Sequence, residues 1–333
     1  MHRLSVAGTR DKLRQCISGA WRTGAWQLGF NRQVFEKATG TRVLVYHGIC
    51  STDHLRYNTL FVTMKAFESQ LRLYKKYFQV VALDDLYSGN FDDRRFTISI
   101  TFDDGFSNNY RFVLPLLEAY EIPATFFITG IREAGYDVLW NDVLAIANRH
   151  GPADFVFRDE LYAKDRSMKY RSTSTGRLLA EELRGQNFAA KAEMIDLLGS
   201  YRYHANRSYW QQMTTEEIRA LAQSKWTAIG SHGYYHNDLA KLPTREAAIE
   251  MHRSKTFLES ITGKPVKAIA YPYGSYTNEL NKAAVECGYS QLLATGFAHR
   301  DEITGKHLKD RLTINPFVST FNQLYASIIG KYD

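Results

Sequence analysis

The feature that most constrains the fold is a repeated alternation of short apolar strands and amphipathic helices that begins at Arg42. Strands are expected at RVLVYHGI, QVVALDDL, FTISITFDD, IPATFFITG, KWTAIGSH, VKAIAYPYG and YSQLLATG. Amphipathic helices separate them, for example at FESQLRLYKKYF and TTEEIRALAQ. Such alternation is typical of a mainly parallel sheet with right-handed crossovers. Seven or so units predict an α/β barrel, complete or distorted, with reactive residues just after the ends of its strands.

Residues from about 140 to 213 break this rhythm. The segment mixes polar runs such as RSTSTG with helical patches such as AAKAEMIDLLGSY. We interpret it as a helical insertion over the barrel mouth, within one domain that spans residues 42–333. Residues 1–41 are expected to form a separate, basic and amphipathic helical segment.

The positive charge of the chain is concentrated at its start. The net charge is +7, and residues 1–42 alone carry eight Lys or Arg against two acidic residues. Leu13, Ile17, Trp21 and Leu28 recur there at roughly helical spacing. Such a helix suits an anionic membrane surface, and it equally suits packing against the domain. Nucleic acid is not expected as a partner, because the basicity is local and no recognised binding motif accompanies it.

Cysteine usage and hydropathy indicate the compartment. Cys16, Cys50 and Cys287 are scattered and form no CxxC pair, which favours a reduced protein. No apolar run approaches ~20 residues, and the start lacks a continuous apolar signal region, so neither a spanning helix nor a cleaved signal peptide is expected. We therefore expect a cytoplasmic protein that can contact the membrane through residues 1–42. The 21 tyrosines would suit a groove for sugar rings, although Tyr is also ordinary core material.

The first motif with chemical potential is TFDDG, residues 101–105, at the end of an apolar strand. Two adjacent carboxylates are costly to bury without compensation, and a metal ion can compensate one of them. Asp103 and Asp104 can both reach one pocket where the strand turns into the glycine loop. The alternative is a solvated turn, since Asp and Gly are common at strand ends.

The second motif is SHGYYH, residues 231–236, at the end of another strand. His232 and His236 have the i, i+4 spacing that places two ligands on one face of a helical turn, as in HxxxH metal sites. Together with Asp104 they would form a two-histidine, one-carboxylate set that leaves positions open for water and substrate. Zinc is the default metal, and Co, Ni or Fe are also compatible. The alternative is that each histidine is structural.

The third motif is YPYG, residues 271–274, again at a strand end. Pro272 fixes the turn, Gly274 allows close backbone approach, and the amide of Tyr273 can point into the mouth. A backbone donor beside a metal would form an oxyanion hole. A plain strand-to-helix turn is the alternative.

In this order the three motifs resemble the NodB-homology polysaccharide deacetylases of carbohydrate esterase family 4, from about residue 42 to residue 320. The resemblance implies a distorted (β/α)7 barrel. It also implies that Asp103 is the general base and that the backbone of Tyr273 is the oxyanion donor. The implied metal ligands are Asp104, His232 and His236.

Two positions depart from the pattern of that family. Gly233 stands where the family has Ser or Thr after the first histidine, so one local side-chain hydrogen bond is missing. Ala270 stands where the family carries an Arg that orients the base. Asp103 must therefore find another partner or work less well oriented.

The general acid of the family is a histidine in an LxxH strand near the C-terminus. His299 and His307 lie in the C-terminal region, but neither belongs to such a strand. LVYH, residues 44–47, has the pattern on the first strand. This order resembles the permuted members of the family, including deacetylases of poly-N-acetylglucosamine. We therefore expect His47 to be the general acid.

The resemblance implies metal-dependent hydrolysis of an N-acetyl group on an amino sugar, in a polysaccharide or a lipid-linked saccharide, with release of acetate. The lack of an export signal favours a cytosolic-side precursor of exopolysaccharide or lipopolysaccharide. One alternative is a hydrolase of another non-peptide C–N bond, such as a small amide or ureide. Another is a non-catalytic sugar-binding relative that lost activity with the missing Arg.

Overall fold

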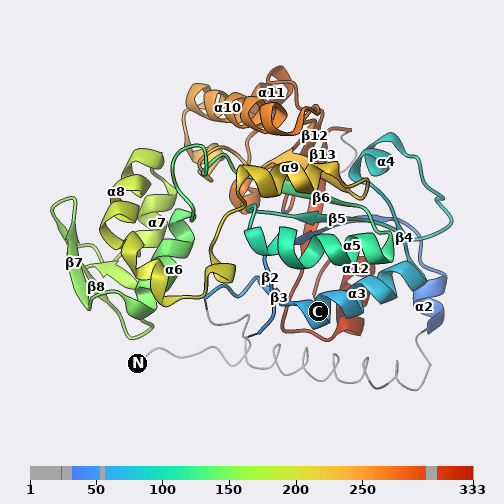
Figure 1. Ribbon diagram of the computed structural model, residues 1–333, viewed down its shortest axis with the longest axis horizontal. Coiled ribbons are helices and arrows are strands. Elements are labelled where there is room, and N and C mark those ends of the chain that lie inside the picture. The colour runs from blue at the N-terminus through green and yellow to red at the C-terminus, as the bar shows by residue number, and fades with distance from the viewer. Residues whose placement is uncertain (1–23, 25–31, 53–56, 298–305, 333) are drawn as a thin grey trace.

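The computed structural model describes residues 24, 32–52, 57–297 and 306–332, and its centre is a closed barrel (Figure 1). Seven parallel strands of the described chain follow one another around the barrel in the order β1, β13, β12, β11, β10, β6 and β5, and β5 pairs back with β1. These strands are β1 (Thr41–Tyr46), β5 (Thr97–Phe102), β6 (Ala124–Ile128), β10 (Thr227–Ser231), β11 (Ala268–Ala270), β12 (Gln291–Ala294) and β13 (Leu308–Thr313). The two-residue β4 (Gln79–Val80) pairs with the start of β5. The predicted distorted (β/α)7 barrel is confirmed.

Amphipathic helices cover the outside of the barrel. They are α3 (Met64–Tyr77), α5 (Leu114–Tyr120), α9 (Thr215–Gln223), α10 (Thr244–Thr262), α11 (Asn278–Glu286) and α12 (Thr320–Ile329). The first turn of α9 is closed by a capping box, in which Thr214 and Glu217 each bond the backbone amide of the other. The helix α10 ends at Gly263 as its sequence indicates, with the left-handed backbone that favours glycine. Its N-cap residue is Pro243.

Side chains of the barrel strands alternate between two cores. Leu44, Ile269 and Leu312 point outward and belong to the large cluster beneath the helices. Val43 and Ala270 belong instead to a small cluster with Phe127 and with residues of α4 (Leu83–Ser88). This period of two follows from strand geometry, and it decides which residues of each strand face the barrel interior.

The segment between β6 and α9 forms a second lobe with a hydrophobic core of its own, at the left of Figure 1. Its helices are α6 (Trp140–His150), α7 (Leu179–Arg184) and α8 (Phe188–Leu198), followed by the short turns η2 (Gly199–His204) and η3 (Arg207–Tyr209). The sequence predicted helices there, but the lobe also contains an antiparallel sheet of three strands. These are β7 (Asp154–Phe157), β8 (Glu160–Lys164) and β9 (Tyr170–Ser172). We refer to residues 140–213 as the insertion.

The basic segment at residues 1–41 lies mostly outside the described residues. Residues 24 and 32–41 are described, and they include the short helix α2 (Arg32–Glu36). The amphipathic helix expected around Trp21 is therefore not tested. Among the described residues, no helix is both long and apolar enough to cross a membrane.

Candidate active site

The paired carboxylates follow the last residue of β5 and are both buried. Asp104 has a φ of 75°, and Gly105 follows with a φ of 78°. A Cβ at Gly105 would lie 2.9 Å from Cγ2 of Ile128, so this turn requires glycine on two counts. The left-handed backbone breaks the strand alternation, and both carboxylates reach the same histidine. Nε2 of His232 lies 3.9 Å from Oδ2 of Asp103 and 3.4 Å from Oδ1 of Asp104.

The two histidines converge through a loop after β10 and not through the helical turn that their spacing suggested. Residues 232–236 have no helical assignment, and positive φ angles of 72° at Gly233 and 57° at His236 bend the chain instead. Glu250 of α10 holds this loop by accepting the amide protons of Tyr234 and Tyr235 at 3.2 and 2.9 Å. Gly233 thus replaces a side-chain hydrogen bond with backbone freedom that the bend requires.

Asp104, His232 and His236 form a compact set of donor atoms. Their ligand atoms all lie within 4.8 Å of one another, and Nε2 of His236 is 3.2 Å from Oδ1 of Asp104. Nδ1 of His232 lies 2.8 Å from the carbonyl of Ala270, to which it donates when it carries the proton, so its Nε2 is left as the bare ligand atom. This second contact is the usual means of orienting a metal-binding imidazole. The donor set fits a divalent metal of the zinc type.

The electrostatics of this set depend on burial and on mutual pairing. Burial alone would raise the pKa of Asp104, but the interactions with the neighbouring imidazoles of His232 and His236 outweigh it and hold that pKa well below its usual value. Burial lowers the pKa of His236, and the neighbouring carboxylate only partly offsets this. His236 is therefore neutral at pH 7, the state in which imidazole binds a metal.

The partner of Asp103 is Arg311, a residue that the sequence analysis did not identify. Its guanidinium donates from Nη1 and Nη2 to the two oxygens of Asp103, both at 2.7 Å, and both side chains are buried. Burial would raise the pKa of Asp103, but the charge of Arg311 outweighs it and lowers that pKa. Ala270 had suggested that one support of the base was missing. The support comes instead from β13, two strands further around the barrel.

The sequence did contain a signal for Arg311. Leu308 and Leu312 pack outward against the helices, so the alternation of β13 places Arg311 on the inward face. Its guanidinium lies 5.5 Å from the ring of Phe127 in the barrel interior. A cation inside the barrel needs a buried anion, and the DD pair is the obvious source.

His47 and His307 lie at opposite ends of the barrel. His47 directly follows β1, and the amide of Asp103 donates to the carbonyl of the preceding Tyr46 at 2.9 Å. Nδ1 of His47 is buried and has no hydrogen-bond partner among the described residues. His307 precedes β13, at the end away from the carboxylates, and its Nδ1 lies 3.1 Å from the carbonyl of Ser290. His299 lies outside the described residues.

The YPYG turn carries the third non-glycine residue of the mouth that has a left-handed backbone. Tyr273 has a φ of 63°, and its ring lies 5.1 Å from that of His236. A Cβ at Gly274 would collide with Thr295 at 1.8 Å, so the turn requires glycine. The guanidinium of Arg184 from α7 lies 4.4 Å from the centre of the Tyr273 ring. The insertion therefore reaches directly over this wall of the mouth.

Two contacts, one of them fully buried, tie the insertion to the histidine loop. Arg184 donates from Nε to Oδ2 of Asp238 at 2.7 Å. Lys191 of α8 donates to Oδ1 of Asn237 at 2.6 Å, and Nδ2 of Asn237 donates to Glu250 at 2.8 Å. Burial lowers the pKa of Lys191 to about 8. The residues just after His236 are thus held from both sides, by the insertion and by α10.

Fold and site together define a class, a parallel (β/α)7 barrel whose mouth gathers two carboxylates and two histidines. The profile of the polysaccharide deacetylase family matches residues 91–151 and 191–292. These ranges include the TFDDG, SHGYYH and YPYG motifs and omit the middle of the insertion. The chain belongs to the polysaccharide deacetylase family, as its motifs predicted. Membership of this family supports the deacetylation of N-acetylated sugars as the activity.

Individual relatives agree with this assignment. YxkH of Bacillus subtilis (strain 168), whose description places it among the polysaccharide deacetylases, is 23% identical over 303 residues that cover 89% of this chain and 77% of YxkH. The Streptococcus pyogenes deacetylase PplD in complex with acetate has a TM-score of 0.58 at 18% identity, covering 87% of this chain and 99% of PplD. IcaB from Ammonifex degensii has a TM-score of 0.54 at 18% identity, covering 88% and 98%. The structural likenesses support the fold.

Proposed function

We propose that this protein hydrolyses the N-acetyl group of an amino sugar, in a polysaccharide or a lipid-linked saccharide, with the help of a divalent metal. The observation that carries the proposal is the convergence of Asp104, His232 and His236 on one point beside an ionised, arginine-held Asp103. A degenerate sugar-binding relative would not need this complete donor set. The overall reaction consumes water and yields acetate and a free sugar amine.

The metal would be held by Asp104, His232 and His236, with zinc the first choice for such donors. When bound, it would supply positive charge that polarises a carbonyl and makes water more acidic. The low pKa of Asp103 is consistent with this requirement. A carboxylate that weakly basic removes a proton only from water whose acidity has been raised.

Asp103 is assigned the role of general base. Its two hydrogen bonds to Arg311 fix the carboxylate plane and keep it ionised at neutral pH. It would take a proton from water as the oxygen attacks the acetyl carbonyl carbon. The amide of Tyr273 is assigned to the oxygen that becomes negative in this step.

His47 is assigned the role of general acid. When the C–N bond breaks, the sugar nitrogen needs a proton, and His47 would donate it. Its position after β1 next to the carboxylate strand supports this role, as does its Nδ1, which has no hydrogen-bond partner in the part of the chain that the structure describes. His307 is a poor candidate, because it lies at the other end of β13.

The test of the proposal is a screen for released acetate. Substrates are N-acetylglucosamine oligomers and lipid-linked N-acetyl sugars, supplied to metal-free protein with and without Zn²⁺, Co²⁺ or Ni²⁺. We expect release only with metal. Metal binding without acetate from any N-acetyl sugar would contradict the proposal and favour a small amide or ureide as substrate.

A matched pair of variants tests the general acid. His47→Gln should lower kcat ~10²–10⁴-fold, the usual contribution of a general acid. His307→Gln should leave kcat unchanged. The opposite pattern would move the acid to another residue, whereas equal losses would point to a stability effect.

The membrane contact of residues 1–42 is a separate proposal, supported by their charge alone. It is tested by co-sedimentation of the full chain with vesicles containing anionic lipid, compared with a chain that lacks those residues. Equal binding of the two would contradict it.

A further inference from the structure

A buried carboxylate just beyond the histidine loop has no part in the chemistry described above. Asp238 lies two residues after His236, and its side chain is fully buried. It is the N-cap residue of the short turn η4 (Leu239–Lys241), yet its side chain makes no capping bond there. The two carboxylate oxygens therefore bind other segments.

Each oxygen of Asp238 binds a different part of the mouth. Oδ1 accepts a hydrogen bond from the hydroxyl of Ser275, and Oδ2 accepts one from Nε of Arg184 at 2.7 Å. Ser275 lies two residues after Tyr273, and Arg184 belongs to α7 of the insertion. One carboxylate thus joins the histidine loop, the YPYG turn and the insertion.

Strand pairing does little to hold the histidine loop against the YPYG turn. In the described chain, β10 and β11 pair only through Ser231 and Ile269, and both loops begin after that pair. The contact between His232 and the carbonyl of Ala270 lies at the start of the loops. Further out, other contacts must fix their separation.

The residue that most needs such contacts is Tyr273. Its φ of 63° belongs to a backbone conformation that persists only where surrounding contacts enforce it. Its phenol oxygen lies 3.5 Å from Nδ1 of His236, at the outer limit of a hydrogen bond. The bond from Ser275 to Asp238 supplies a second tie, and Asp238 also holds Arg184, whose guanidinium lies 4.4 Å from the Tyr273 ring.

We infer that Asp238 is a positioning residue of the candidate active site. Through Ser275 it fixes the amide of Tyr273 relative to the metal ligand His236, and through Arg184 it attaches the insertion to both. The inference rests on the proposed function and adds to it a residue that acts through others, since Asp238 is not in the donor set.

The sharpest variant is Ser275→Ala, which removes the bond to the YPYG turn and leaves the donor set intact. With an N-acetylglucosamine oligomer as substrate, kcat should fall about 10- to 100-fold, as loss of orientation does, while KM and zinc affinity stay within about 2-fold. Ser275→Thr keeps the hydroxyl and should restore most of kcat. Ser290→Ala is the matched control, because Ser290 is exposed directly before β12, at the opposite end of the barrel.

A double-mutant cycle assigns the effect to Asp238. Asp238→Asn should lower kcat at least as much as Ser275→Ala, because its amide can no longer accept from both donors. Ser275→Ala should then add little in the Asp238→Asn background, since both changes act through the same bond.

A second measurement does not depend on turnover. Acetohydroxamate can bind a metal ion while its carbonyl oxygen takes the place of the acetyl oxygen, so its affinity reports on the amide of Tyr273. Calorimetry on the zinc-loaded full chain should show binding about 5-fold weaker in Ser275→Ala, the scale of one hydrogen bond, and unchanged in Ser290→Ala.

The outcomes separate the inference from the proposed function. Unchanged kcat and hydroxamate affinity in Ser275→Ala overturn the inference while leaving deacetylation intact. Parallel losses of kcat, zinc affinity and thermal stability also overturn it, because they would show a structural role alone. If no N-acetyl sugar yields acetate, the proposed function fails, and the hydroxamate then decides: weaker binding by Ser275→Ala supports the inference, and equal binding overturns it. A chain that binds no zinc overturns both.

Discussion

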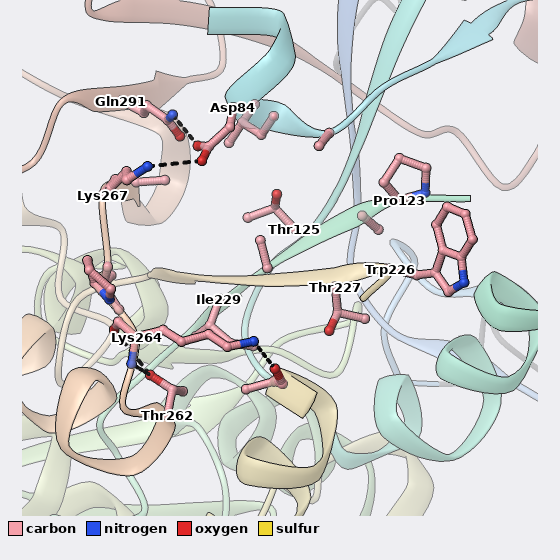
Figure 2. A pocket seen from close by; sticks show the side chains of 18 of the residues that line it. Asp84, Pro123, Thr125, Trp226, Thr227, Ile229, Thr262, Lys264, Lys267 and Gln291 are labelled. Carbon is pink, nitrogen blue, oxygen red and sulfur yellow. Dashed lines mark hydrogen bonds and ion pairs between the residues drawn. The ribbon is translucent and has the colours of Figure 1, made fainter. Parts of the chain in front are cut away.

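The two ends of the barrel differ in how far their charged side chains are exposed to solvent. At the N-terminal end, Figure 2 shows Lys267 and Gln291 both reaching Asp84 around a pocket of about 450 Å³. This pocket is larger than the one of about 380 Å³ that Arg184 and Tyr273 line beside the mouth. The Lys267 and Asp84 side chains there are more than half exposed. At the mouth, by contrast, the charged groups are buried, and the DD turn, the histidine loop and the YPYG turn all contain left-handed residues.

Cavity size therefore does not identify the candidate active site. Asp104, His236 and Tyr273 are three of the seven non-glycine residues with positive φ in the described chain. Such backbone persists only where surrounding contacts enforce it, and it gathers at functional sites. The ordinary, solvated ion pair at the N-terminal end has no such signature. Function at the strand ends and stability at the strand starts is the division expected of a barrel.

The largest expected effect comes from removing a metal ligand at the mouth. Asp104→Ala should lower kcat/KM at least ~10³-fold, since the charge stabilisation by a metal is worth several kcal/mol. Elemental analysis should show bound metal falling from one ion per chain to well below one. Full activity without metal would contradict the assignment of a metal-dependent active site to the mouth.

The next effect separates the base from the ligands. Asp103→Asn should lower kcat ~10²–10⁴-fold, the usual contribution of a general base. Metal content should stay at one per chain, because Asp103 is not in the donor set. Loss of metal together with activity would instead place Asp103 among the ligands.

Arg311 should determine where activity falls at acidic pH, because it lowers the pKa of Asp103. Because burial raises the pKa of Asp103 and Arg311 lowers it, Arg311→Met should raise that pKa. The base works only when deprotonated, so the acidic limb of the kcat/KM profile should move to higher pH, by about one unit or more. At pH 7, loss of orientation should lower kcat/KM about 10- to 100-fold. Arg311→Lys keeps the charge and should shift the limb less, and an unmoved limb in both variants would show that another group sets it.

Much of this mouth was predictable from the sequence because its groups lie at strand ends, and strand ends can be located locally. The DD pair, the two histidines and the YPYG turn each follow an apolar run of period two or a buried strand. Parallel pairing then brings those ends together whatever their separation in sequence. The family assignment followed from the same local motifs.

What the sequence could not supply depends on pairing between distant strands or on irregular loops. Arg311 was missed because the arginine that orients the base was expected at the position of Ala270, on β11. Only the closed barrel shows that an arginine on β13 reaches the same carboxylate. The histidine loop was taken for a helical turn because i, i+4 spacing does not distinguish a helix from a loop bent at Gly233. The sheet of β7, β8 and β9 was missed because its strands are short and because β7 and β8 are largely exposed or half-buried.

Lys191 should have a smaller effect, which tests whether the insertion supports the mouth. Lys191→Met removes the hydrogen bond to Asn237, next to His236, and should weaken metal affinity about 10-fold, as loss of an outer contact commonly does. The folded-state pKa of Lys191 is about 8 against an ordinary 10.5, so the unfolded chain binds more protons between these values. The stability of the natural chain relative to Lys191→Met should therefore rise from pH 8 to 10.5, by up to about 3 kcal/mol.

Chemical denaturation at several pH values measures this difference, and titration with a competing chelator measures the metal affinity. Leu197→Ala is the control, because Leu197 is exposed on the same helix. If Lys191→Met kept normal metal affinity, the insertion would be a cover for the mouth and not a support for it.

The smallest effect is expected at the N-terminal end, from Asp84→Ala. This change removes the 3.1 Å ion pair with Lys267 and the 2.6 Å hydrogen bond from Gln291. Exposed ion pairs contribute about 0–1 kcal/mol because water and salt screen them, so the free energy of unfolding should fall by no more than about 1 kcal/mol. kcat/KM should not change, since the pair lies at the opposite end of the strands from Asp103. A loss of activity without a loss of stability would mean that the two ends are coupled through the barrel, and the division between them would then have to be abandoned.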